Sequence, residues 1–189
     1  MAKTYSLTPR LKLIVDHLEA VRALDEYVAG GGLKKDMQGL SNHLQQDLNS
    51  SVLRPAGWED LWAEGALLYS SPKSKWQVVR DDVIAIEVYP AWPVQDEEPS
   101  VNLYVPANWK RRTQFIDKLK PPLGFEHVSQ YPAGELAEET SVFKYLPYTN
   151  YLRAGGEFDC SGFIDAFREA AKALVVKEED IDEILAGLA

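Results

Sequence analysis

Apolar residues near the start of the chain recur at intervals of three and four, the spacing of one face of an α-helix. This first stripe consists of Leu11, Val15, Leu18, Val21, Leu24 and Val28. Thr8 followed by Pro9 predicts the start of the helix, and the glycines at 30–32 predict its end. A second stripe consists of Met37, Leu40, Leu44 and Leu48 and predicts a helix over 34–50. The two helices are expected to form a hairpin that buries both stripes against each other or against a sheet.

A different period governs the middle of the chain. In "VIAIEVY" at 83–89, apolar residues on one side alternate with a mixed set on the other, which predicts a half-buried strand. Residues 76–80 are its expected partner, so the Asp81-Asp82 dipeptide falls at a hairpin turn. A third strand is predicted over 101–105. The preceding stretch 55–70 is less regular, and its Trp58, Leu61, Trp62 and Leu68 suit a short helix.

The rest of the chain contains segments with the helical spacing and segments with the strand alternation. Asn108 is expected to cap a helix that runs to 120, where Pro121 and Pro122 stop it. "FEHVSQ" at 125–130 and "SVFKYL" at 141–146 read as strands. Asp159 or Ser161 begins a helix, and "KEEDIDEILAGLA" closes the sequence as a short acidic one.

This order of elements predicts an α+β fold, with an N-terminal helical hairpin, a mostly antiparallel sheet of about five strands, and C-terminal helices packed on the sheet. One domain over 1–189 is expected. Its predicted parts are a helical region at 8–70, a sheet region at 74–147 and C-terminal helices at 159–188.

Composition limits the class of protein. The chain has 189 residues, 46% of them hydrophobic and 26% charged, as in ordinary globular proteins. No apolar run approaches the roughly 18 residues of a membrane span, and "MAKTYSLTPR" lacks the apolar core of a secretory signal. A single cysteine excludes an intramolecular disulfide framework. We therefore expect a soluble cytoplasmic protein with no membrane partner.

Charge is unevenly distributed. The formal net charge is −9, and residues 121–189 carry 5 basic and 13 acidic side chains, a net −8. Nucleic-acid binding needs a basic stripe and is disfavoured. The exception is a basic cluster at a predicted helix start, suited to holding an anion: Trp109, Lys110, Arg111 and Arg112. The alternative is an amphipathic helix with solvated bases.

Three carboxylates lie close in sequence: Asp81, Asp82 and Glu87. Clustered acids hold divalent cations in nucleases and phosphatases. The order of elements resembles the core of PD-(D/E)xK nucleases, although Tyr89 stands where that motif has lysine. A charged turn and an exposed strand face are favoured over a catalytic site, and no metal or cofactor is expected.

Glu87 shares one predicted sheet face with polar and aromatic neighbours. These are Ala85, Tyr89, Asn102, Tyr104 and Gln77. Tyrosines supply rigid contact area and polar tips supply direction, so the face suits recognition. The alternatives are that a helix covers it or that it meets water.

Other motifs carry little chemistry. Cys160 at a helix start has no predicted histidine partner, so an inert thiol is favoured. His17, His43 and His127 lack the spacing of a zinc site. Ser70-x-x-Lys73 matches a serine–lysine pair, but its internal Pro72 opposes the helix that such a pair needs.

Aromatic residues in predicted loops, beside acidic clusters, are typical of protein recognition. The residues predicted to contact a partner are the aromatic Trp92, Tyr148 and Tyr151 and the acidic Glu138 and Glu139. Tyr131 lies nearby in the sequence. The sequence therefore favours a non-catalytic interaction or regulatory protein whose expected partner is a basic macromolecule, namely a protein, as for immunity proteins and antitoxins. The alternative is a divergent metal-dependent nuclease-like or other phosphodiester-processing enzyme.

Overall fold

The computed structural model describes residues 8–61, 67–70, 76–80, 82–90, 98–127, 140–155 and 157–188. Backbone contacts divide the chain into two compact units, residues 1–42 and 43–189. Each unit is described by itself below.

In the first unit, the predicted long helix is divided by a turn at His17. Helix α1 spans Pro9–Asp16 and helix α2 spans Leu18–Ala29. The backbone N–H of Lys12 donates to the carbonyl of Thr8, which agrees with the predicted helix start. Helix α2 has no buried residue. The expected burial of the first stripe in a helical hairpin is therefore wrong for α2.

Glycine makes the connection from α2 to α3, which spans Gly32–Leu48. Gly31 has a φ of +77°, a conformation that side chains other than glycine rarely adopt. The Tyr27 ring lies over Gly32, where an added Cβ would come within 2.3 Å of it. The Tyr27 hydroxyl donates to the Asp36 carboxylate, so α2 and the start of α3 are tied across the glycines.

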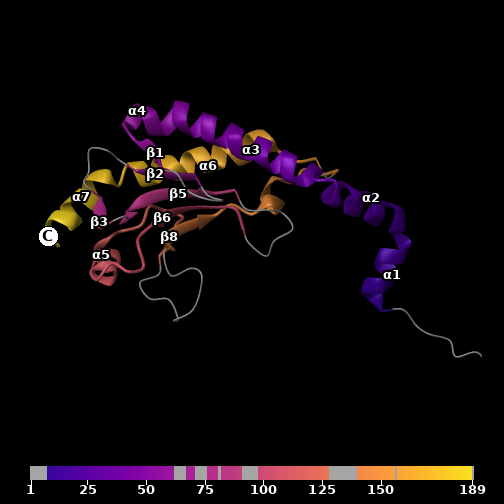
Figure 1. Cartoon of the computed structure of the whole chain (residues 1–189), viewed down its shortest axis with the longest axis horizontal. Coiled ribbons are helices and arrows are strands. Elements are labelled where there is room, and N and C mark those ends of the chain that lie inside the picture. The colour runs from indigo at the N-terminus through magenta and orange to yellow at the C-terminus, as the bar shows by residue number, and fades with distance from the viewer. Residues whose placement is uncertain are drawn as a thin grey trace, which may run out of the picture. The chain divides into compact units, whose positions relative to one another are not determined.

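The second unit contains a six-stranded antiparallel sheet flanked by helices, and the predicted α+β fold is confirmed. The strand order is β1-β2-β5-β6-β8-β7. The strands are β1 Glu59–Leu61, β2 Leu67–Ser70, β5 Ala85–Tyr89, β6 Ser100–Tyr104, β7 Glu126–His127 and β8 Thr140–Tyr145. Figure 1 shows the central strands side by side beneath helix α6.

The stretch predicted as a short helix near Trp58 instead supplies two strands. Helix α3 passes into the π-helical turn η1 at Asn49–Leu53 and then the single turn α4 at Arg54–Ala56. Strands β1 and β2 follow and pair with each other. Strands of three and four residues are too short to show a period of two, so the tryptophans and leucines gave a misleading helical pattern.

The hairpin expected at 76–89 also differs. Strand β3 (Gln77–Val79) pairs with β4 (Asp82–Val83), so Asp82 is a strand residue and not part of the predicted turn, whereas Asp81 lies outside the described residues. This pair is a separate two-stranded sheet, and β2 is the neighbour of β5 instead. Gln77 therefore does not share the sheet face of Glu87, contrary to expectation.

One face of the main sheet carries a group of buried side chains at its centre. Its buried residues are Tyr69, Ile86, Val88, Val101, Leu103 and Val142. Helix α6 (Cys160–Val175) packs on β5 and β6 and contributes Phe163, Phe167 and Leu174 to the core. The Asp159 carboxylate accepts from the Gly162 N–H at 3.1 Å, which confirms Asp159 as the cap.

Two tryptophans anchor the last helix, α7 (Glu178–Ala186). Trp58 and Trp76 meet edge to face with ring centroids 4.8 Å apart. The indole N–H of Trp58 donates to Glu178 at 3.0 Å, and that of Trp76 donates to Asp182 at 2.7 Å. These two acids are one helical turn apart, so both face the tryptophan pair.

Helix α5 is shorter than predicted. It spans Arg112–Lys118 rather than 108–120, and Asn108 lies in a preceding turn instead of capping it. Phe115 and Ile116 are fully buried. In the parts of the chain that the structure describes, no helix is long and apolar enough to cross a membrane.

Candidate functional site

The acids of the nuclease alternative lie on different elements. Glu87 is in the middle of β5 in the main sheet, whereas the backbone of Asp82 begins β4 in the small sheet. Asp81 lies outside the described residues. Among the residues that are described, no three His, Cys, Asp or Glu side chains lie together as metal ligands.

Glu87 and Asn102 are direct cross-strand neighbours, as the sequence predicts. The Asn102 amide donates to the Glu87 carboxylate at 2.9 Å. Ala85 and Tyr104 are likewise opposite each other, and Tyr89 is two residues from Glu87 on the same face. Glu87, Tyr89 and Tyr104 are half-buried. The face is therefore assembled as expected apart from Gln77, and its role in recognition stays a prediction.

The loop aromatics have mixed positions. Tyr148 and Tyr151 lie in the 3₁₀ turn η3 (Tyr148–Tyr151) and pack their rings on Phe163, with centroids 5.1 Å away in each case. The Tyr148 hydroxyl donates to the carbonyl of Pro90 at 2.7 Å, and burial raises the Tyr148 pKa to about 12. Both side chains thus support the core. Trp92, Tyr131, Glu138 and Glu139 lie outside the described residues.

The basic cluster at 109–112 precedes α5. Trp109 packs on Phe115 with ring centroids 5.5 Å apart, and Arg112 donates to the Val105 carbonyl at 3.3 Å. Lys110 and Arg111 are exposed. Trp109 and Arg112 therefore pack or bond locally, and anion binding by the cluster stays a prediction.

The remaining candidates in the described part of the chain lie on separate elements. Cys160 is the exposed first residue of α6. His17 and His43 are exposed, and the side chain of His127 is outside the described part. Ser70 ends β2, and Lys73 lies outside the described residues.

A site that the sequence did not predict lies where α3 gives way to β1. A depression of about 510 Å³ is bordered there by Arg54, Gly57, Trp58, Glu59 and Asp60. Its volume falls within the range of small-molecule sites, about 300–1,000 Å³. We call it the Asp60 depression.

The Asp60 carboxylate accepts hydrogen bonds from two side-chain amides. Gln45 and Asn49 both donate to Asp60 Oδ2, at 3.4 and 3.2 Å. Asn49 is the first residue of the π-helical turn η1, a rare feature that occurs frequently at functional sites. One carboxylate oxygen, Oδ2, is thus bound to the protein, and Oδ1 accepts no hydrogen bond within the described part of the chain.

Two buried polar atoms lie next to Asp60. Asn49 is 8% exposed and Tyr69 is 0% exposed, yet Asn49 Oδ1 and the Tyr69 hydroxyl have no hydrogen-bond partner among the described residues. Tyr69 is opposite Asp60 across the β1–β2 pair. Burial raises the pKa of the Tyr69 hydroxyl, and the negative charge of Asp60 raises it further. Each unsatisfied buried group costs about 1–3 kcal/mol, so these two atoms destabilise the fold.

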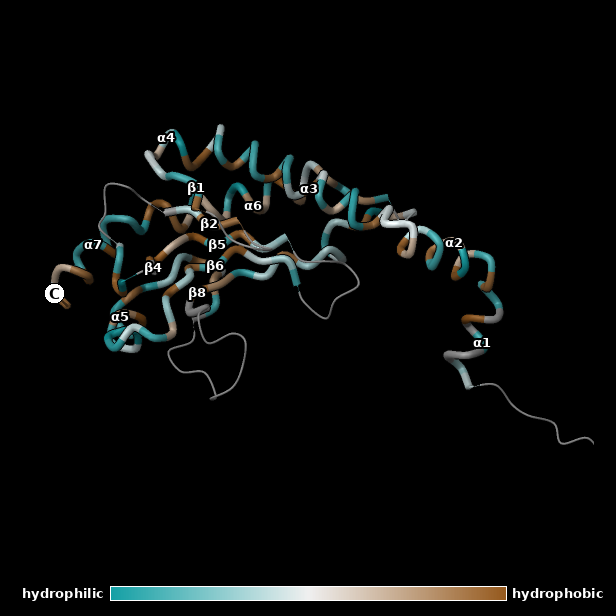
Figure 2. Tube along the Cα trace, viewed as in Figure 1, coloured by the Kyte–Doolittle hydropathy of each residue, from teal (hydrophilic) through white to brown (hydrophobic). Residues whose placement is uncertain are grey.

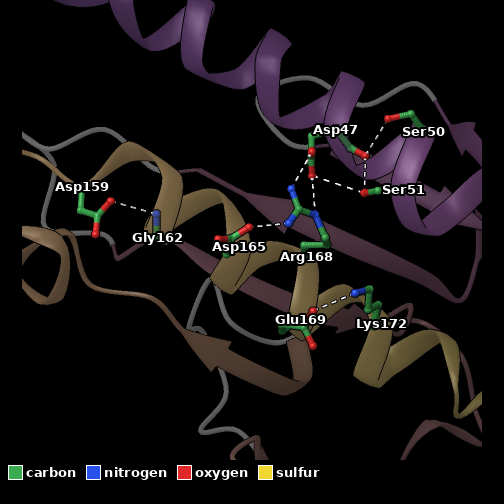
Figure 3. Close-up of polar contacts among 9 residues, drawn as sticks. All are labelled: Asp47, Ser50, Ser51, Asp159, Gly162, Asp165, Arg168, Glu169 and Lys172. Atoms are coloured by element: carbon green, nitrogen blue, oxygen red, sulfur yellow. Dashed lines mark hydrogen bonds and ion pairs between the residues drawn. The ribbon is translucent and has the colours of Figure 1, made fainter.

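An ion pair between Asp47 and Arg168 joins the C-terminal end of α3 to α6 (Figure 3). Arg168 on α6 donates to both oxygens of Asp47, at 3.0 and 2.7 Å, and also to Asp165. The hydroxyl of Ser51 donates to the Asp47 carbonyl at 2.6 Å. The hydrogen bonds from Arg168 hold the Asp47 pKa below its ordinary value. Helix α6 thereby fixes the position from which Asn49 reaches Asp60.

Sequence reasoning missed this site because no motif marks it. Asn49 and Asp60 lie in a stretch read as two helices, and neither has a spacing that predicts chemistry. Comparison with models of known protein families, with curated proteins and with solved structures gives no match for this chain.

Proposed function

We propose that the protein acts by binding a macromolecular partner rather than by catalysis. The observation that carries this proposal is the exposed apolar stripe of the first unit. Its members on α2 and their exposed fractions are Leu18 41%, Val21 39%, Leu24 58% and Val28 42%. Contiguous exposed apolar side chains usually mark interaction surfaces.

Helix α2 has the form of a helix that binds in a groove. Figure 2 shows hydrophobic positions recurring along α2 between hydrophilic ones. The polar positions include Glu19, Arg22 and Glu26, so the helix is amphipathic. A partner that offers an apolar groove would bury the stripe at anchors three and four residues apart.

The charge of the chain favours a basic protein partner. Residues 121–189 carry 5 basic and 13 acidic side chains, which would attract positive surfaces and repel nucleic-acid phosphates. Glu179 is exposed on α7 and available for such attraction. Glu178 is half-buried and accepts a hydrogen bond from the Trp58 indole, so we assign it to stabilising the fold and not to attracting a partner. On this proposal the protein works in the cytoplasm, in the manner of an immunity protein or antitoxin.

The test compares two double variants in affinity purification from the native host. Leu18→Gln with Leu24→Gln removes apolar anchors but keeps good helix formers. Glu19→Gln with Glu26→Gln changes the polar side of the same helix and is the control. We expect wild type and control to recover one shared basic protein, and the stripe variant to lose it.

Association rates at two salt concentrations complete the test. The rate with the recovered partner should fall as salt rises, because salt screens attraction between opposite charges. Equal recovery by the stripe variant would contradict the assigned surface. An acidic partner, or self-association of the wild type lost in the stripe variant, would contradict a basic partner.

A further inference from the structure

We propose that the Asp60 depression is a binding site for a small cationic amino carboxylate, a molecule that carries a carboxylate together with ammonium or guanidinium groups. This inference is independent of the partner-binding stripe, because every residue involved belongs to the second unit.

The first argument is that unpaired charges of both signs border the depression. Arg54, Glu59 and Asp60 are all exposed there. Within the described part of the chain, Arg54 and Glu59 form no ion pair with each other or with any other residue. Among the lining residues that the structure describes, one guanidinium and two carboxylates sum to a net charge of −1. A ligand of net charge +1 with one carboxylate complements this set: its anionic group meets Arg54 and its cationic groups meet the two acids.

The second argument is that hydrogen bonds within the protein already orient the Asp60 carboxylate to accept from a ligand. Its Oδ2 is held by Gln45 and Asn49, which orients Oδ1 without occupying it. Groups oriented in advance lose less entropy when a ligand binds. The Asp47–Arg168 pair fixes the helix that carries both amides. Asp60 is therefore ready to accept from an N–H donor.

The third argument concerns two buried polar groups that lie next to the Asp60 carboxylate. Asn49 Oδ1 and the Tyr69 hydroxyl are buried and lack partners among the described residues, and both lie beside the Asp60 carboxylate. Folded proteins rarely leave such groups unsatisfied without a functional reason.

The experiment measures binding by calorimetry to the full-length protein. L-arginine carries the complete set of groups, agmatine lacks the carboxylate, and glutarate lacks the cation. We expect L-arginine to bind, agmatine to bind more weakly, and glutarate to give no heat. Asp60→Asn should weaken L-arginine binding by about tenfold or more, because it removes a charge-assisted hydrogen bond.

Matched variants separate the site from general charge. Glu59→Gln should weaken L-arginine binding, whereas Glu126→Gln on β7, at the opposite edge of the sheet from β1, should leave it unchanged. Far-UV circular dichroism of Asp60→Asn should match wild type, so that a loss of binding reports the site. Absence of L-arginine binding to wild type, or equal weakening by Glu126→Gln, would overturn the proposal. Equal affinity for agmatine would overturn the role of Arg54.

Discussion

At the residue scale, Arg168 is the side chain that joins the end of α3 to α6. It makes a two-bonded contact with Asp47, and the two side chains are 27% and 21% exposed. Paired N–H donors in this geometry form stronger bonds than single neutral ones. Because Asn49 lies two residues beyond Asp47, the same contact also positions the amide that holds Asp60.

The Asp47–Arg168 pair predicts a pH dependence of stability. The Asp47 pKa is lowered chiefly by hydrogen bonds from Arg168, against a smaller opposing effect of burial. A carboxylate with a lowered pKa in the folded state stabilises the fold above its unfolded pKa, about 4 for aspartate. That contribution is lost as the pH falls through the lowered folded value.

We expect Asp47→Asn to reduce the free energy of unfolding at neutral pH by about 1–2 kcal/mol. It should also flatten the decline of stability below about pH 4. Urea unfolding across that pH range is the measurement, with Asp117→Asn on the exposed side of α5 as the control. An unchanged acid limb in Asp47→Asn would show that the pair does not control acid stability.

At the element scale, the turn from α3 to β1 depends on one glycine. Gly57 follows α4 with a φ of +83°, and its N–H donates to the Arg54 carbonyl at 2.9 Å. The next N–H, of Trp58, donates to the Leu53 carbonyl at 2.8 Å. These bonds satisfy the last carbonyls of the helix and direct the chain into β1.

Two glycine substitutions should have opposite effects. Gly57→Ala should destabilise the protein by about 1–2 kcal/mol, because a Cβ disfavours the left-handed conformation. Gly39→Ala, inside α3 with open space around it, should stabilise by about 0.5–1 kcal/mol. Thermal unfolding of the two variants checks both signs. A neutral Gly57→Ala would mean that the turn relaxes without strain.

At the scale of the whole molecule, the chain consists of two units that differ in how many side chains they bury. The extended buried sheet face and its aromatic core belong to residues 43–189, whereas α2 buries no side chain. All five tryptophans also lie after residue 43, so tryptophan fluorescence reports on the second unit alone.

Removing residues 1–31 should leave the second unit intact. We expect the free energy of unfolding, followed by tryptophan fluorescence in urea, to fall by less than about 0.5 kcal/mol, as for exposed substitutions. Phe167→Ala in the full chain is the comparison and should cost about 3–5 kcal/mol, because Phe167 is fully buried. A loss on truncation as large as that of Phe167→Ala would show that the two units unfold as one.

The sequence by itself determined the elements whose burial follows a regular period. Ile84, Ile86 and Val88 are fully buried, as are Val101, Leu103 and Val105, because alternating apolar residues fit only a half-buried strand. The helix start at Pro9 and the cap at Asp159 were predictable for a similar reason, since a local backbone need selects the residue type. The pairing of Glu87 with Asn102 followed from the same alternation once the two strands were neighbours.

Tertiary structure alone decided which elements meet. The pairing of β2 with β5 and the separation of β4 from β5 depend on contacts between segments far apart along the chain, which no local pattern encodes. The exposure of the α2 stripe is of the same kind, because an amphipathic helix has one sequence whether or not a partner covers it. The Asp60 depression is the clearest case: Gln45, Asn49, Asp60 and Tyr69 come together only because a π-helical turn and two short strands place them there.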